Sequence, residues 1–236
     1  MFASLPMYHR AETAATLDAI WEAMRNSIAR AGLVAPLKLD QSKVGIDAWL
    51  RPDMVLSQTC GMPFRKKLYP DVVLVGTIDH GVEGCEAGYY NSVIIKQRDR
   101  TLPDDPRPVV NDMLSQSGYA ALLEVLPMMT NPTLSGAHLN SAKMVADGVA
   151  DIAAIDAVTW RLIKRFEPFH EKLQVLQTTT PRPALPLITK VYADQVEVLH
   201  NALVQGLDKV DPAAKKLLGV KGLVHIPASA YLSVTP

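Results

Sequence analysis

The sequence predicts an α/β protein of two lobes, each a mostly parallel sheet flanked by helices. Short apolar strands alternate with helical segments along most of the 236 residues, and such alternation is typical of parallel sheets. Two proline-rich stretches, 101–108 and 180–186, bracket a middle block. We therefore expect a discontinuous first lobe, residues 1–97 with 183–236, and an inserted second lobe, residues 98–182, joined by two crossings of the chain.

The first lobe is expected to start with a short apolar strand over residues 2–6. Segment 11–31 has five large apolar side chains at helical spacing and ends before a glycine, which predicts an amphipathic helix. Residues 37–39 and 54–57 have the apolar character of short buried strands. The β-branched run 72–78 is typical of a central parallel strand.

The same alternation continues from residue 92 to the end of the chain. Apolar segments predict further strands at 92–96, 109–111, 152–155, 173–178 and 187–191. Apolar residues at helical spacing predict helices directly after Ser117-Gly118 and over 140–148, 157–166, 196–207 and 213–218. The 101–108 stretch is expected to connect the two lobes.

The composition excludes several functional classes. Hydrophobic residues make up 48% of the chain, which is enough for a substantial core. Lys+Arg and Asp+Glu are both 24 and aromatic residues only 6%, which argues against a nucleic-acid partner. Apolar runs are far shorter than a membrane span, and residues 1–8 lack the basic and apolar regions of a signal peptide. The chain is therefore either cytosolic or separated from its leader.

The first candidate site is the segment from Asn111 to Tyr119, which lies between a buried strand and a helix. We expect Ser115 to cap the helix and Ser117 and Gly118 to lie in its first turn. Free N–H groups at a helix start, together with hydroxyls, can bind an anion without lysine or arginine. An ordinary capped helix is the simpler interpretation.

Two further candidates follow strands of the second lobe. His138 is expected to end a strand and to point into the crevice where open α/β sheets bind ligands. Asp156 directly follows the 152–155 strand, so it could bond a ligand or cap the next helix. A lone histidine is more often structural, and a capping aspartate needs no ligand.

The first lobe offers neutral polar groups. Ser57, Gln58 and Thr59 follow a short strand, and Tyr8 and Tyr90 could add hydroxyls, although tyrosines often serve only in packing. Asp79-His80 resembles part of a metal site or an acid–base pair, but no neighbouring motif supplies the remaining residues. Cys60 lacks the signature of a cysteine nucleophile, and no dinucleotide, phosphate-loop or serine-hydrolase motif is present. Two cysteines, Cys60 and Cys85, are too few for a disulfide scaffold, so one bridge and two unpaired thiols are both open.

Four ordered segments make the chain resemble the phosphate/phosphite/phosphonate-type substrate-binding proteins of ABC transporters. The first two are Ser115-Gln116-Ser117-Gly118-Tyr119, and Gly136-Ala137-His138 with the helix through Asp151. The third is the strand-to-helix segment 153–160 around Asp156. The fourth is 56–61 with Gly84-Cys85-Glu86 and Tyr90-Asn91-Ser92, which resembles a subgroup with a cysteine pair.

The resemblance implies a type 2 periplasmic-binding fold with a small anion held between two lobes. It assigns Ser115, Gln116, Ser117, Gly118, His138 and Asp156 to ligand binding from the inserted lobe, and Tyr8, Gln58, Thr59 and Tyr90 from the first lobe. It also implies a Cys60–Cys85 disulfide and hence an oxidising compartment, the periplasm. Gln116 departs from the family, because a small hydroxyl residue is usual there and a longer amide would reshape the pocket.

These expectations together describe ligand capture without chemistry. We expect a solute-binding protein that holds a phosphonate, phosphate or related oxyanion for an ABC permease, with no catalytic residue, no cofactor, no metal and no nucleic-acid partner, acting as a monomer. An enzyme of the same fold, acting on a small carboxylate or pyrimidine in cofactor biosynthesis, is one alternative. A cytosolic ligand sensor is the other.

Overall fold

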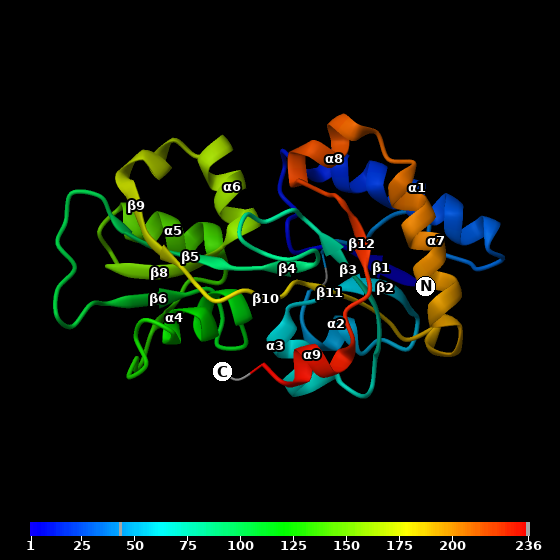
Figure 1. Ribbon diagram of the computed structural model, residues 1–236, viewed down its shortest axis with the longest axis horizontal. Helices are drawn as coiled ribbons and strands as arrows, with labels where there is room; N and C mark the ends of the chain where they lie inside the picture. The colour runs from blue at the N-terminus through cyan, green and yellow to red at the C-terminus, as the bar shows by residue number, and fades with distance from the viewer. Residues whose placement is uncertain (43, 235–236) are drawn as a thin grey trace. The chain divides into compact units, whose positions relative to one another are not determined.

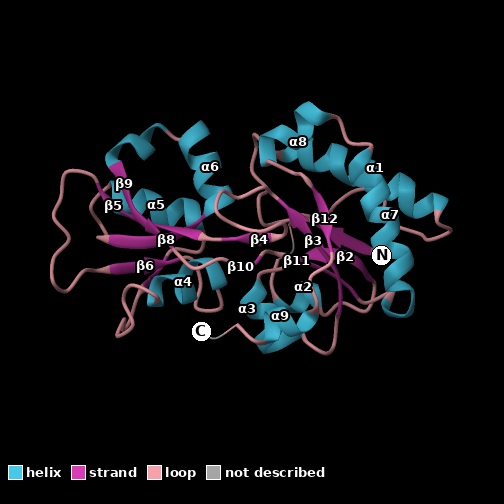
Figure 2. Cartoon of the chain, in the orientation of Figure 1, coloured by secondary structure: helices cyan, strands magenta, loops and turns pink. Residues whose placement is uncertain are grey.

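A computed structural model describes residues 1–42 and 44–234 and divides them into two compact units (Figure 1). Unit 1 comprises Met1–Tyr89 and Pro183–Ser233, and unit 2 comprises Tyr90–Arg182 and Val234. The chain passes between them through strands β4 (Tyr89–Tyr90) and β10 (Arg182–Pro183), which pair with each other. Each unit contains one five-stranded sheet and its own helices (Figure 2).

The sheet of unit 1 has the order β1-β2-β11-β3-β12. Strands β1 and β2 are parallel, whereas β11 is antiparallel to both of its neighbours and β12 is antiparallel to β3. The expectation of mostly parallel sheets is therefore wrong for unit 1, because its last two strands come from the returning chain. The strands are β1 (Phe2–Ser4), β2 (Met54–Gln58), β3 (Val73–Asp79), β11 (Pro186–Thr189) and β12 (Gly222–Val224).

Two long helices of unit 1 pack closely against each other. They are α1 (Ala14–Arg30) and α7 (Val196–Asp208), and a Cβ atom on Gly206 would lie 2.6 Å from the Cα atom of Met24. The shorter helices are α2 (Ile46–Trp49), α3 (Gly61–Pro63), η1 (Phe64–Leu68), η4 (Ala193–Gln195), α8 (Pro212–Leu218) and α9 (Ala228–Leu232).

The sheet of unit 2 has the order β7-β6-β8-β5-β9 and is also mixed. Strands β7, β6 and β8 are mutually parallel, whereas β5 is antiparallel to β8 and to β9. Valine, isoleucine and alanine side chains of β5, β6 and β8 form its core with helices α5 and α6. The strands are β5 (Ser92–Gln97), β6 (Pro108–Val110), β7 (Thr133–Leu134), β8 (Ile152–Asp156) and β9 (Leu173–Thr178).

The helices of unit 2 follow its parallel strands. A short π-helical turn and one α-helical turn follow β6, and longer helices follow β7 and β8. They are η2 (Gln116–Ala120), α4 (Ala121–Leu123), α5 (His138–Ala146), α6 (Ala157–Phe166) and η3 (Pro168–Lys172).

Three local expectations differ from the structure. Ser92–Gln97 belongs to unit 2 rather than to the first lobe, because this strand pairs with β8 and β9. The proline-rich stretch 101–108 connects β5 to β6 inside unit 2 and does not link the units. Residues 37–39 form no strand, although Asp40 donates its N–H to the carbonyl of Ala3. No helix among the described residues is long and apolar enough to cross a membrane.

Candidate functional site

Three helices of unit 2 begin at one edge of its sheet. Because β6, β7 and β8 run parallel, their carboxyl ends lie at the same edge, where open α/β sheets commonly bind ligands. The helical segments η2, α5 and α6 start just beyond these strand ends. The structure therefore gathers six of the predicted residues at this edge: Ser115, Gln116, Ser117, Gly118, His138 and Asp156.

The turn from Ser115 to Gly118 is fixed by a side-chain cap. The Oγ atom of Ser115 accepts the N–H of Gly118 at 2.9 Å, which confirms the predicted N-cap. A Cβ atom on residue 118 would lie 1.9 Å from Oδ1 of Asn111, so any residue other than glycine would have to displace this amide. The following turn is π-helical rather than α-helical, and π-turns are frequent at functional sites.

Ser117 and His138 are joined directly. The Oγ atom of Ser117 lies 2.8 Å from Nε2 of His138, which brings together side chains 21 residues apart. Burial lowers the pKa of His138 to about 4, and the backbone of Ala154 opposes this shift only in part. The imidazole is thus neutral at neutral pH. Its Nδ1 atom is buried.

His138 occupies a helix start rather than a strand end. Strand β7 ends at Leu134, and residues 135–137 turn the chain before α5 begins at His138. Gly136 has a φ of +79° in this turn, which favours glycine. The expected position at the end of a strand is therefore wrong. The edge of the sheet is the expected one, because the turn is only three residues long.

Asp156 is the last residue of β8 and caps α6. Its Oδ1 atom accepts the N–H of Thr159 at 2.8 Å, which confirms the predicted cap, and the residue is buried. In the antiparallel register of β5 and β8, Asp156 lies opposite Ser92. Hydroxyl, imidazole and helix-start N–H groups at this edge can donate hydrogen bonds to an oxyanion. None of the six gathered residues is a lysine or arginine.

A shallow polar pocket of unit 2 adjoins this edge and encloses about 180 Å³ of empty space, open solvent included. Its lining comes from three segments, namely the start of β5, the turn η2–α4 and the chain after β9. The nine lining residues are all polar except Ala121, and they are Tyr90, Asn91, Ser92, Gln116, Ala121, Glu124, Thr179, Thr180 and Arg182. We call it the Arg182 pocket. It contains two predicted site residues, Gln116 and Tyr90.

Tyr90 belongs to unit 2, although the resemblance assigned it to the first lobe. The other three residues assigned there, Tyr8, Gln58 and Thr59, do lie in unit 1 and are all buried. Gln58 ends β2 and pairs with Leu187 of β11. The N–H of Thr59 bonds the carbonyl of Pro186 at 3.0 Å.

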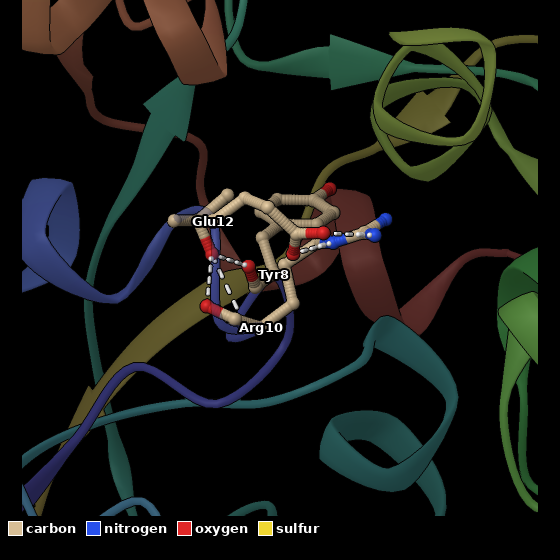
Figure 3. A network of polar contacts seen from close by, with 4 residues as sticks. Tyr8, Arg10 and Glu12 are labelled. Carbon is tan, nitrogen blue, oxygen red and sulfur yellow. Dashed lines mark hydrogen bonds and ion pairs between the residues drawn. The ribbon is translucent and has the colours of Figure 1, made fainter. Parts of the chain in front are cut away.

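Tyr8 stands in a tightly bonded loop before α1. Its ring meets His80 edge-on at 5.0 Å between centroids, and its carbonyl accepts the hydroxyl of Thr13 at 2.7 Å. The guanidinium of Arg10 forms two hydrogen bonds to Glu12 beside it (Figure 3). These contacts fix the backbone of the loop.

The predicted disulfide is wrong. No disulfide joins Cys60 and Cys85, and each residue is half-buried in unit 1. A disulfide requires specific Cα and Cβ separations, which neither the cysteine count nor a resemblance in sequence can fix. Burial raises the pKa of the Cys85 thiol, so this cysteine is mainly protonated at neutral pH.

Some residues at this edge were not singled out in the sequence. Asn111 had been quoted only as the start of the serine segment, although its amide packs against Gly118. Thr179, Thr180 and Arg182 lie at the start of a stretch whose only signal was its proline and threonine content. Glu124 gave no signal, because one carboxylate at the end of a helix is common on protein surfaces.

His80 had been noted as half of an incomplete pair with Asp79. It is buried, and its Nδ1 atom lies 2.9 Å from the carbonyl of Leu218. Among the described residues, no group of three or more His, Cys, Asp or Glu side chains could hold a metal ion.

Comparisons with known proteins identify the fold. No protein-family model and no curated protein matches the sequence. Among solved structures, PhnD1 from Prochlorococcus marinus in complex with methylphosphonate has a TM-score of 0.71 at 12% identity, over 98% of this chain and 94% of that one. The binding protein component of an ABC phosphonate transporter from Pseudomonas aeruginosa has a TM-score of 0.63 at 16% identity, over 95% and 80%.

The chain has a periplasmic-binding-protein fold of type 2. XAC2383 from Xanthomonas citri, bound to ATP, also shares this fold, with a TM-score of 0.68 at 15% identity over 98% of this chain and 92% of that one. Ligands as different as methylphosphonate and ATP thus occur on related frameworks. The shared fold does not fix a ligand, because the side chains that each framework carries decide what it binds.

Proposed function

We propose that the protein is a solute-binding protein for a small oxyanion of the phosphonate or phosphate class, and that unit 2 supplies the principal oxyanion contacts. The observation that carries the proposal is the 2.8 Å contact between Ser117 and His138 at the edge where three helices begin. Such groups satisfy an oxyanion by directed hydrogen bonds rather than by net charge. Two solved structures of this fold are described as a methylphosphonate complex and a phosphonate-transporter component, which supports the class.

Each residue has a defined part in this proposal. Ser115 uses its hydroxyl to hold Gly118, so it shapes the turn. Ser117 donates its hydroxyl to the oxyanion while the neutral imidazole of His138 positions it. Asp156 holds the start of α6. Its carboxylate can also accept a hydrogen bond from a protonated oxygen of the ligand. Tyr8, Gln58 and Thr59 of unit 1 remain proposed secondary contacts.

The partners follow from the same proposal. An ABC permease would receive the ligand, and the protein would act as a single copy outside the cytoplasm. Capture needs no bond to break, because binding shifts an equilibrium between conformations that already exist. Mass spectrometry of the ligand before and after incubation tests this point, and any conversion of the ligand would favour an enzyme instead.

Ligand-dependent stability is the direct test of the proposal. Phosphate, phosphite, methylphosphonate and acetate are each titrated while the melting temperature is recorded. A bound oxyanion at 100 times its dissociation constant should stabilise the protein by about 2.7 kcal/mol. Absence of any shift with all phosphorus oxyanions would contradict the proposal.

Ser117→Ala sharpens this test. Loss of a hydroxyl that bonds a charged oxygen should weaken the responding oxyanion by about 1–3 kcal/mol, measured by titration calorimetry. Ser229→Ala, at an exposed serine in α9 of unit 1, is the matched control and should bind as the native protein does. Equal affinity for Ser117→Ala and Ser229→Ala would remove Ser117 from the site.

A further inference from the structure

The Arg182 pocket begins beside the proposed oxyanion site. Gln116 lines it and is the chain neighbour of Ser117, so their Cα atoms are about 3.8 Å apart. Ser92 also lines it and lies opposite Asp156 in the β5–β8 register. Directly opposite residues of antiparallel strands have Cα atoms about 4.5–5.5 Å apart. A substituent on an oxyanion bound at Ser117 therefore has a short path into this pocket.

The charges in the pocket are one cation and one anion, and they face each other. Glu124 accepts the backbone N–H of Thr180 at 2.9 Å, and its other oxygen lies 3.4 Å from Nη2 of Arg182. A carboxylate that entered would meet Glu124, and an ammonium group would meet Arg182. Either would lose hydration without gaining a free counter-charge.

One donor in the pocket is unused. The Nε atom of Arg182 is buried and has no hydrogen-bond partner among the described residues. A buried donor without an acceptor is unfavourable, so a group that supplies an acceptor oxygen gains a bond there. The pocket is small. Much of its space is open solvent, so it admits about one water-sized group of a substituent.

We propose that the Arg182 pocket is a subsite for a small neutral substituent with an acceptor oxygen, namely a hydroxyl, carried by the oxyanion ligand. This proposal rests on the proposed function and narrows it. The preferred ligand is then a hydroxyalkyl oxyanion rather than a bare phosphate or an alkylphosphonate. Gln116, the departure from the resembling family, connects the two parts of the site.

Matched ligand pairs test the proposal. Titration calorimetry compares methylphosphonate with hydroxymethylphosphonate, and ethylphosphonate with 2-hydroxyethylphosphonate. We expect at least one hydroxylated ligand to bind roughly tenfold more tightly than its partner. Phosphonoacetate and 2-aminoethylphosphonate carry charged substituents, so neither should bind more tightly than ethylphosphonate.

Arg182→Lys keeps the positive charge and removes the Nε–H donor. The ratio of the affinity for the hydroxylated ligand to that for its unsubstituted partner should therefore fall toward one. Arg165→Lys, at an exposed arginine of α6, is the control and should keep the native preference.

Glu124→Gln provides an independent measurement, because it leaves Arg182 without its carboxylate. In that variant the affinity for phosphonoacetate relative to ethylphosphonate should rise roughly tenfold.

The outcomes separate the two proposals. If no phosphonate or phosphate binds, the proposed function fails and the subsite fails with it. If alkylphosphonates bind but the native protein prefers neither hydroxylated ligand, the pocket holds only water and the subsite alone is overturned. A native preference that Arg182→Lys leaves intact would also overturn the subsite. Retained phosphonate-induced stabilisation of each variant excludes misfolding as the cause of a change.

Discussion

The two units share an architecture but treat their strand-end polar groups differently. In unit 1 Ser4 ends β1 and Ser57 is the next-to-last residue of β2, and their fully buried hydroxyls bond each other at 2.7 Å. In unit 2 the corresponding edge holds Ser117 and His138, which bond each other at the starts of two helical segments, and His138 is only half-buried. Polar groups that bond each other stabilise a fold, whereas groups with remaining capacity can bind a ligand.

Close-packed glycines make the same distinction. Gly206 of unit 1 lets helices α1 and α7 approach, since a Cβ there would lie 2.6 Å from the Cα atom of Met24. Gly118 of unit 2 instead lets the helix start lie against the amide of Asn111. One glycine thus serves the packing of helices, and the other serves the geometry of the candidate site.

Alanine at each glycine separates these roles and should give the largest effects. Gly206→Ala forces two backbones apart, so it should destabilise unit 1 by about 1–3 kcal/mol. Gly118→Ala displaces only the side chain of Asn111, so it should weaken oxyanion binding more than it lowers stability. Denaturant unfolding with hydrogen exchange resolved by peptide measures the first effect, and calorimetry measures the second.

Gly222→Ala is the matched control for both variants. A Cβ atom at residue 222 meets nothing within 4 Å, and no left-handed φ restricts this position. Its stability and binding should stay close to those of the native protein. If Gly118→Ala bound oxyanions normally while Gly206→Ala abolished binding, the assignment of the site to unit 2 would be wrong.

Much of this contrast was accessible from the sequence, because it depends on local patterns. Ser115 and Asp156 were predicted as helix caps from residue type and position, and both act as caps. The strand over 173–178 and the helix over 157–166 were predicted to the residue. Hydrophobic periodicity and capping chemistry act over a few residues, so they can be read directly from the chain.

Features that depend on long-range pairing were not accessible in this way. The antiparallel placement of β5 and β11 arises from strands distant in sequence, so the sheets are mixed rather than mostly parallel. The Arg182 pocket needs Gln116, Glu124 and Arg182 together, and no spacing rule joins these residues. The separation of Cys60 from Cys85 likewise depends on tertiary structure, which is why a pairing inferred from resemblance failed.

Acid titration tests the lowered pKa of His138, the half-buried histidine of the candidate site in unit 2. The pKa of His138 falls from 6.5 to about 4 on folding, so the unfolded chain binds more protons between these values. The free energy of unfolding should therefore rise with pH through this window and be lost as the pH drops from 6.5 to 4. His138→Gln should remove about 1–2 kcal/mol of this dependence, which is less than the full shift because the residue as a whole is only half-buried.

Denaturant unfolding at several pH values between 4 and 7 measures that dependence. His225→Gln, at an exposed histidine of unit 1, should leave the native slope unchanged. An unchanged slope for His138→Gln would mean that the imidazole is hydrated and charged in the folded state. The proposed difference between the Ser4–Ser57 pair of unit 1 and the Ser117–His138 pair of unit 2 would then lose its support.

The cysteines of unit 1 provide the smallest expected effect. No disulfide joins Cys60 and Cys85, so a reductant should not change the stability of unit 1. A thiol reagent should label two cysteines in each unfolded chain without prior reduction. In the folded protein Cys85 should react slowly, because burial raises its pKa and keeps it protonated. If the unfolded chain had no reactive thiol before reduction, and if reduction lowered the melting temperature, Cys60 and Cys85 would form a disulfide.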